Sequence, residues 1–227
     1  PLFTVLLQII SLSNKISFVK YLLLIIYSLF IFSHESYAQG IKSNLDHIPL
    51  KTQFKPVDYK GGIQSWAFDQ DSLGILYAAN NNGLLEFDGV NWKLYKVPNS
   101  GRTRSVKVDK QNRIFVGGQG QLGYFYKTKN ILSFVSLLDL LPADKKEIAE
   151  TWKILENDGI IYFNTESELF AYQNDSIKAL NLAGYMRYAF VVNGEVFAQF
   201  YNNGLFKLDN NEFIPIGGTQ ITSDIVS

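Results

Sequence analysis

One segment of the chain returns in altered form, and the distance between its two copies constrains the fold more than any other feature of the sequence. Asn-Asn-Gly-Leu-Leu-Glu-Phe-Asp at Asn81–Asp88 reappears as Asn-Asn-Gly-Leu-Phe-Lys-Leu-Asp at Asn202–Asp209, 121 residues further along. This separation is close to three units of about 40 residues, the period of a β-propeller blade. A single four-stranded unit cannot bury both of its faces, so such units stack radially against copies of themselves.

The strand pattern agrees with this period. Short β-rich runs separated by turn residues follow one another from Ile63 to Ile216, with the spacing of strands in an all-β domain. Asp88-Gly89 and Asn193-Gly194 lie between such runs, and these pairs favour tight hairpins because both residues tolerate positive φ. The pattern therefore predicts an all-β fold, a β-propeller with four consecutive four-stranded antiparallel blades.

Two segments depart from the regular spacing. Leu138–Glu150 contains Pro142 and many helix formers, and it predicts a short helix or an irregular excursion between two blades. Ile221–Val226 would begin a fifth blade. Because propellers close with about four to eight blades, we expect the ring to be incomplete in this chain. Pro1 at the start and Met186 as the only methionine likewise predict a fragment.

The N-terminal region carries the pattern of an export signal. Lys15 and Lys20 precede the apolar run Tyr21–Phe32, and Ser36-Tyr37-Ala38 supplies a small-residue cleavage site. This order of charged, apolar and cleavage regions is typical of a secretory signal peptide. An uncleaved membrane anchor, helped by the apolar stretch Leu2–Leu12, is the alternative. Either interpretation predicts an exported protein.

These features divide the chain into three parts. We expect a signal peptide at residues 1–38, of which residues 1–14 could be spurious upstream sequence. An extended lead-in follows at residues 39–62, and propeller blades occupy residues 63–227. The predicted location is the periplasm or another extracytoplasmic space.

Charge and cysteine content exclude several classes of function. The chain has 21 basic and 21 acidic residues; without Lys15, Lys20 and Glu35 of the signal, 19 and 20 of these remain, with no block of like charge. Such a chain does not attract nucleic acid by bulk electrostatics. It contains no cysteine, so neither disulfides nor thiol catalysis is available to it.

Two motifs match ligand-binding patterns formally, and a turn explains each better. Gly118–Gly123 fits the dinucleotide fingerprint, which needs a helix behind it, but the strand-like Tyr124-Phe125-Tyr126 follows. Asp69-x-Asp71 begins like a calcium loop, but Asn80 stands where the closing Glu should be.

Other metal and catalytic sites find no support in the sequence. His47 alone cannot form a zinc site. Acidic residues could pair as in a glycosidase, but most lie at predicted turns. We therefore predict no metal site, no cofactor and no catalytic residue.

The segment Ile75–Trp92, followed by Arg104-Ser105-Val106 and Arg113–Gly118, resembles the two-component-regulator propeller repeat. In that family a strand ends in an Asn-Gly or Asp-Gly loop, the next strand reads Gly-Leu-x-x-Phe-Asp-Gly, and a Trp or Phe opens the outer strand. The resemblance covers about Ile63–Ile216 and is clearest in the first two units. It implies the exported sensor region of a bacterial one-component or hybrid two-component regulator. Such regions are typically followed by a triple-tyrosine domain, a membrane helix and a cytoplasmic kinase or DNA-binding output. This sequence shows no histidine-kinase box, receiver or DNA-binding helices.

Strand direction predicts where ligand-binding residues gather. In an antiparallel blade, the loop that enters the inner strand and the loop between the second and third strands lie on one face of the disc, here called the entry face. Asn, Gln, Arg and aromatic side chains on that face suit a neutral or anionic glycan. The candidate ligand-binding residues are Asn81, Arg102, Arg104, Gln119, Trp152, Arg187 and Tyr201. The competing interpretations are solvated loop residues and, for Trp152, packing between blades.

Two classes of function fit these observations. The first is a non-enzymatic extracytoplasmic sensor of a glycan or another small extracellular ligand, tethered to the inner membrane and working with downstream domains of the same chain or as a homodimer. The second is a secreted propeller enzyme or lectin that acts on polysaccharide. The repeat resemblance and the lack of a catalytic cluster favour the sensor.

Overall fold

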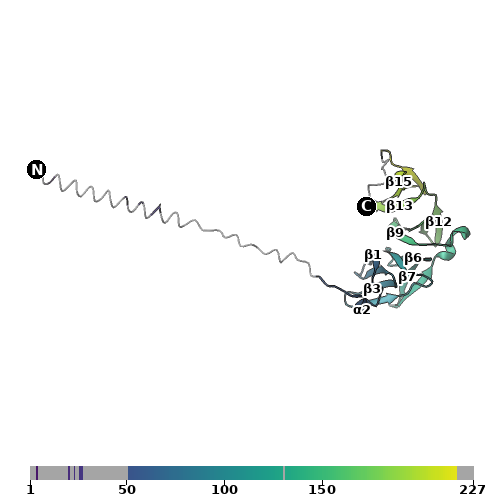
Figure 1. The fold of residues 1–227 in the computed structure, drawn as a ribbon, viewed down its shortest axis with the longest axis horizontal. Helices are drawn as coiled ribbons and strands as arrows, with labels where there is room; N and C mark the ends of the chain where they lie inside the picture. Colours follow the sequence, from purple (N-terminus) through teal and green to yellow (C-terminus); the bar gives the residue numbers. More distant parts are fainter. Residues whose placement is uncertain are drawn as a thin grey trace. The chain divides into compact units, whose positions relative to one another are not determined.

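The computed structural model describes residues 51–129 and 131–218, together with Thr4, Lys20, Leu23, Ile26 and Tyr27 (Figure 1). The chain divides into two units, Pro1–Thr52 and Gln53–Ser227. The predicted cleavage site at Ala38 and the predicted fifth blade at Ile221–Val226 lie outside the described residues. Among the residues that are described, no helix is long and apolar enough to cross a membrane.

The second unit is built from four antiparallel sheets, each made of four strands that are consecutive in the chain, and the predicted fold is confirmed. Blade 1 contains β1 (Ser65–Gln70), β2 (Leu76–Asn80), β3 (Gly83–Phe87) and β4 (Trp92–Tyr95). Blade 2 contains β5 (Thr103–Val108), β6 (Ile114–Gly118), β7 (Gln121–Thr128) and β8 (Ile131–Ser136). Blade 3 contains β9 (Thr151–Asn157), β10 (Ile160–Thr165), β11 (Leu169–Gln173) and β12 (Ser176–Leu180). Blade 4 contains β13 (Met186–Val192), β14 (Glu195–Phe200), β15 (Gly204–Asp209) and β16 (Glu212–Pro215).

The first strand of each blade lies innermost. Strand β1 contacts β5, β5 contacts β9, and β9 contacts β13, so the blades are neighbours in the order of the chain. The colours of Figure 1 follow the same order from blue to yellow-green. This is the arrangement of a propeller, in which each sheet packs face to face with the next.

Each pair of neighbouring blades encloses its own apolar core, and alternation along the strands divides the side chains between cores. In β6, Ile114 and Val116 belong to the core shared with blade 1, whereas Phe115 between them belongs to the core shared with blade 3. In β10, Phe163 faces blade 2 and Tyr162 faces blade 4. Successive side chains of a strand point to opposite faces, so a blade with neighbours on both sides must be apolar on both.

The predicted excursion between blades 2 and 3 is present. It contains two short 3-10 helices, η2 (Leu138–Leu140) and η3 (Ala143–Lys145). Leu137, Leu141 and Ile148 on either side of these helices are buried in the core between blades 2 and 3. The excursion is therefore anchored by apolar side chains rather than held free of the blades.

The lead-in differs from the expected extended segment at one point. Residues Pro56–Tyr59 form the one-turn helix α2, and the Lys55 backbone N–H donates to Asp58 Oδ2 at 2.7 Å. Phe54 and Tyr59 contact Trp92 of β4, with ring centroids 5.5 and 5.8 Å apart. Contact of these rings with Trp92 on the outer strand explains why the segment packs against blade 1 instead of remaining extended.

The turn interpretation of the calcium-like motif is confirmed by its hydrogen bonds. Asp71 Oδ1 accepts the backbone N–H groups of Leu73 and Ile75, both at 2.9 Å. Asp69 instead reaches blade 2, where its Oδ2 accepts the Val108 N–H at 2.7 Å. Both carboxylates are thus engaged by the backbone, one within a hairpin and one between blades.

The glycine-rich motif also has a packing explanation. Gly118 ends β6 and the following residues form β7, so no helix stands behind the loop. A Cβ on Gly118 would overlap the Arg102 carbonyl oxygen, and a Cβ on Gly117 would lie 2.5 Å from Thr151 Cγ2. Glycine is required here because two neighbouring strands approach its Cα.

Replacing Gly117 with alanine should destabilise the protein by about 1–3 kcal/mol, the range for overpacking a close-packed core. The new methyl group would collide with Thr151 of blade 3 and force the two blades apart. Urea and thermal denaturation measure the change. Gly217→Ala is the matched control, because nothing lies within 4 Å of a Cβ at Gly217, and it should cost less than about 0.5 kcal/mol. Equal midpoints for the two variants would contradict the predicted contact.

Candidate functional site

Every inner strand carries a register irregularity at the same place. The pairing of the first two strands of a blade skips one residue between Ser65 and Ala67, Thr103 and Ser105, Thr151 and Lys153, and Met186 and Tyr188. The skipped residues, here called the bulge residues, are Trp66, Arg104, Trp152 and Arg187. A bulge releases one residue from the alternation of the strand and re-aims its side chain. Four blades therefore present a Trp, an Arg, a Trp and an Arg at equivalent positions.

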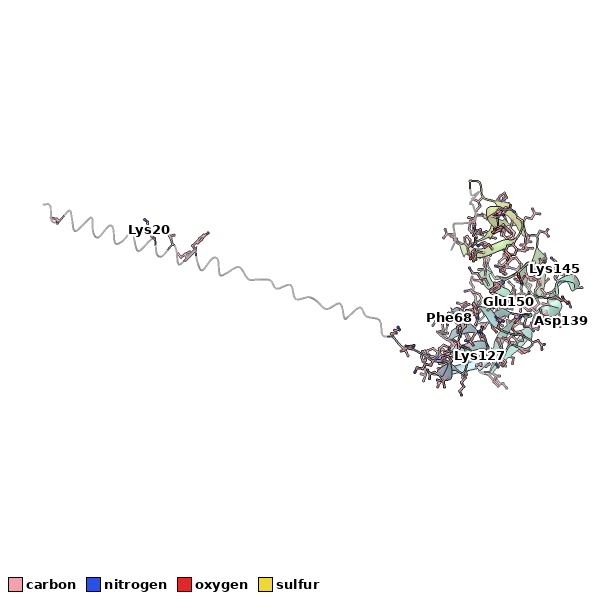
Figure 2. All side chains as sticks on the ribbon, in the orientation of Figure 1. Lys20, Phe68, Lys127, Asp139, Lys145 and Glu150 are labelled. Carbon is pink, nitrogen blue, oxygen red and sulfur yellow. The ribbon has the colours of Figure 1, made fainter. Side chains whose placement is uncertain are left out.

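Three of the bulge residues form a stack across blades 1, 2 and 3. The Arg104 guanidinium carbon lies 3.8 Å from the Trp66 ring centroid and 4.8 Å from that of Trp152. Arg104 Nε also donates to Glu150 Oε2 at 3.2 Å. Glu150, which is labelled in Figure 2, belongs to the segment that enters β9. The Arg104 and Glu150 side chains are only 8% and 14% exposed. Two cation–π contacts and an ion pair thus join three blades at their inner strands.

The loops of the entry face lie together within each blade, as the direction of the strands requires. The Asn81 N–H donates to the Gln64 carbonyl at 3.1 Å in blade 1, and the Gln119 N–H donates to the Arg102 carbonyl at 3.0 Å in blade 2. In blade 4 the Tyr201 N–H donates to the Tyr185 carbonyl at 2.8 Å. Each of these bonds joins the loop after the second strand to the segment that enters the first.

The structure brings some candidate residues together and separates others. Asn81 accepts the Trp66 Nε1–H at 2.8 Å and so supports the stack. Arg102 and Gln119 have exposed side chains beside the entry of β5. Tyr201 is exposed in the loop after β14. Arg104 is not a solvated loop residue, because it lies in β5, buried between two tryptophans.

Trp152 and Arg187 line the same cavity between blades 3 and 4. This blade 3–4 cavity has a volume of about 500 Å³. The start of β9, the end of β10 and the start of β13 form its walls, which consist of Trp152, Lys153, Asn164, Thr165, Glu166, Tyr185, Met186, Arg187 and Tyr188. Among these residues the Arg187 guanidinium carbon lies 5.5 Å from the Tyr188 ring centroid. The cavity combines exposed rings, two cations and an amide.

Sequence reasoning missed Lys153, Asn164, Tyr185 and Tyr188. Lys153 and Tyr188 directly follow bulge residues, and a comparison of the four inner strands would have shown that these positions are small in blades 1 and 2, where Ala67 and Ser105 stand. Asn164 is the partner of Lys153 across the sheet of blade 3. An alignment of the four repeats therefore contains the difference in side-chain size. The pairing register of the first two strands is needed to show which positions are equivalent.

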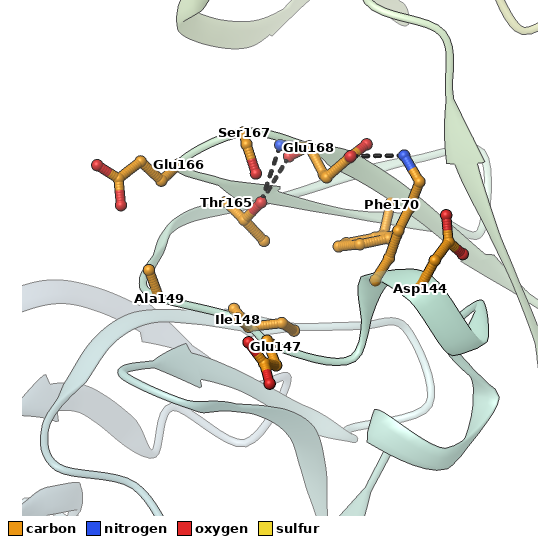
Figure 3. Close-up of a pocket in the computed structure, with 10 residues that line it drawn as sticks. Asp144, Glu147, Ile148, Ala149, Thr165, Glu166, Ser167, Glu168 and Phe170 are labelled. Carbon is orange, nitrogen blue, oxygen red and sulfur yellow. Dashed lines mark hydrogen bonds and ion pairs between the residues drawn. The ribbon is translucent and has the colours of Figure 1, made fainter.

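A second, smaller cavity of about 230 Å³ lies between the excursion and the loop that joins β10 to β11 (Figure 3). Lys145 Nζ donates to Glu168 Oε1 at 2.5 Å across it, and the Glu168 N–H donates to Thr165 Oγ1 at 3.0 Å. Figure 3 shows the Glu166 side chain pointing away from Glu168. In the part of the chain that the structure describes, no three His, Asp or Glu side chains gather as metal ligands.

Removing the Arg104 side chain should destabilise the propeller by about 1–3 kcal/mol, because Glu150 would be left partly buried without its partner. Arg104→Ala also removes the group held between Trp66 and Trp152. Chemical denaturation measures the loss. The matched control is Arg102→Ala, two residues earlier and exposed, which should change stability by less than about 0.5 kcal/mol. An Arg104→Ala variant as stable as the control would show that the stack contributes no stability.

Comparison with known proteins supports the fold and does not reach the level of a family. No protein-family model matches the chain, and no curated protein matches it. Among solved structures, the extracellular domain of a protein described as a hybrid two component system from B. thetaiotaomicron is 15% identical, with a TM-score of 0.52 over 70% of this chain and 22% of that one. This chain thus spans about a fifth of that domain.

Two further propellers are similar to a comparable extent. A streptogramin B lyase is 15% identical, with a TM-score of 0.54 over 67% of this chain and 55% of the lyase. YCF48 bound to a D1 peptide is 16% identical, with a TM-score of 0.50 over 72% of this chain and 57% of YCF48. At these identities the likeness concerns the backbone alone. The sheet topology and these neighbours together establish that residues 65–215 contain four blades of a β-propeller.

Proposed function

We propose that this chain is the extracytoplasmic sensing region of a bacterial signal-transduction regulator and that it binds a small ligand without converting it. The observation that carries the proposal is the position of two bulge residues, because Trp152 and Arg187 place a ring and a guanidinium group in the wall of a cavity between packed blades. Such groups recognise rings and anions, and they supply neither a nucleophile nor a ready proton donor.

Three independent features support this proposal. The repeat resembles that of two-component-regulator propellers, most clearly across Ile75–Trp92. The N-terminal sequence around Tyr21–Phe32 has the order of an export signal. A protein of the same fold is described as the extracellular domain of a hybrid two component system. The proposed regulator would be tethered to the inner membrane by downstream segments and would pass the signal to a kinase or a DNA-binding module.

The disposition of the carboxylates argues against an enzyme. A general acid or base must hold its proton within reach of a substrate. Near the entry face, Glu150 is paired with Arg104 and Glu168 with Lys145. In the turns of the opposite face, Asp71 and Asp109 accept backbone N–H groups. Most carboxylates of the four blades thus serve the fold.

A secreted propeller enzyme or lectin that acts on polysaccharide is the second candidate. It is favoured by one observation, the likeness of the backbone to a streptogramin B lyase. Since one fold can carry either activity, the two candidates differ in the segments that the gene encodes after the propeller. The deciding test is the sequence of the gene downstream of the codon for Ser227. A membrane helix followed by an output module is the expected result, and a stop codon soon after ring closure would contradict the sensor.

The N-terminal residues should direct export. Residues 1–62, given an initiator Met and fused to an alkaline phosphatase without its own signal, should yield periplasmic phosphatase activity. Leu23→Arg with Ile26→Arg should abolish it, because each charge in the apolar run costs about 2.5–3.5 kcal/mol on an insertion scale. Leu23→Val with Ile26→Val is the matched control and should retain activity. Equal activity of the Arg and Val fusions would rule out an export signal in this region.

A further inference from the structure

We propose that the blade 3–4 cavity binds an acidic sugar, with the carboxylate or sulfate of the ligand beside Lys153 and Arg187 and its ring against the exposed aromatic side chains. This inference rests on the proposed sensing function and names its ligand class and its site. It depends on a comparison of equivalent positions at successive blade interfaces, together with the charge and exposure of the cavity walls.

Between blades 2 and 3, the position next to the bulge is closed by small residues. Gly117 leaves space for Thr151 of blade 3, whose Cγ2 lies 2.5 Å from where a Cβ would stand. The Ser105 hydroxyl donates to the Thr151 carbonyl oxygen at 3.0 Å and lies 3.3 Å from that of Gly117. Thr151 is completely buried. At these three positions the interface between blades 2 and 3 therefore leaves no room for a ligand.

Between blades 3 and 4, larger residues occupy the same three register positions. Lys153 stands where blade 2 has Ser105, Asn164 where it has Gly117, and Met186 where blade 3 has Thr151. All three line the blade 3–4 cavity. An interface that only had to close could use the small residues of its neighbour, so a lysine and an asparagine at these positions indicate a role beyond packing. The volume of about 500 Å³ lies within the range of small-molecule sites, about 300–1,000 Å³.

The charge of the cavity favours an anion. Lys153 Nζ makes no hydrogen bond or ion pair with any residue that the structure describes. Partial burial lowers the pKa of Lys153, with no neighbouring acid to offset it. Arg187 adds a second cation to the walls, and Glu166 is the one carboxylate among them. A bound oxyanion would supply the partner that Lys153 lacks, and Glu166 is available to accept hydrogen bonds from hydroxyl groups.

The aromatic residues favour a ring. Trp152 and Tyr185 line the cavity and are 48% and 63% exposed, although they belong to the inner part of the blades. Large aromatic side chains that remain exposed around one cavity mark a binding surface. Their faces can stack on the apolar side of a pyranose, while the Asn164 amide can donate to and accept from its hydroxyl groups.

The test is calorimetric titration of the complete extracytoplasmic region with matched probes. The probes are a disaccharide that contains glucuronate, its counterpart with glucose in place of glucuronate, and a disaccharide with and without a sulfate. We expect at least one acidic probe to bind and its neutral counterpart to bind at least about tenfold more weakly. Lys153→Gln and Arg187→Gln should each weaken the acidic probe about tenfold or more. Arg102→Gln, on the same face but outside the cavity, should leave affinity unchanged.

A second measurement separates binding from folding. Thermal denaturation should show that Lys153→Gln is as stable as the parent, since the Lys153 ammonium makes no hydrogen bond or ion pair with a described residue. In the parent, NMR of isotopically methylated lysines should show the pKa of Lys153 rising when the acidic probe binds, because a neighbouring anion favours the charged form. A merely structural lysine would not respond.

The proposal is overturned if no acidic probe binds, if the neutral probes bind equally well, or if Lys153→Gln and Arg187→Gln retain full affinity. The proposed sensing function fails differently. Binding of an acidic probe by a protein whose gene ends soon after the propeller would refute the regulator and leave the binding site in place.

Discussion

The structure depends on the burial of both faces of each sheet. A four-stranded antiparallel sheet in water can leave one face polar, but blades 2 and 3 are covered on both sides by other blades. Their second strands therefore contain an unbroken apolar run, Ile114–Val116 in β6 and Ile160–Phe163 in β10. Because adjacent residues belong to adjacent cores, the packing of one interface is coupled to that of the next.

The bulge of the inner strand links this scaffold to recognition. Regular alternation would place every side chain of β5 on one of the two sheet faces. The extra residue at Arg104 escapes that constraint, and it meets Trp66 and Trp152 from the blades on either side. An equivalent bulge places Arg187 at the start of β13, the inner strand of blade 4. The bulge thus occurs in all four blades with two different results. Arg104 joins three blades through contacts with Trp66 and Trp152, whereas Arg187 lines the blade 3–4 cavity.

This double use separates residues that sequence reasoning had grouped. Arg104 and Arg187 occupy equivalent positions, and both were candidates for ligand contact. Glu150 and the two tryptophans engage Arg104 in the fold, whereas Arg187 lines a cavity beside Lys153. The two arginines differ in role because different residues surround them. Their positions in the sequence alone do not show which residues those are. Asn81 likewise supports Trp66 rather than standing free.

The sequence by itself determined the propeller, its four blades and the excursion at Leu138–Glu150, because strand periodicity and turn residues are local properties. It also placed Arg102, Gln119 and Tyr201 on loops, since loop position follows from strand order. Only the tertiary structure decided which side chains meet. The register shift that skips Trp152 arises from the pairing of two strands within blade 3. The contrast between Gly117 and Asn164, and the lack of a polar partner for Lys153, arise where one blade faces the next. Such relations are set by packing across sheets, whereas local sequence patterns specify only the strands themselves.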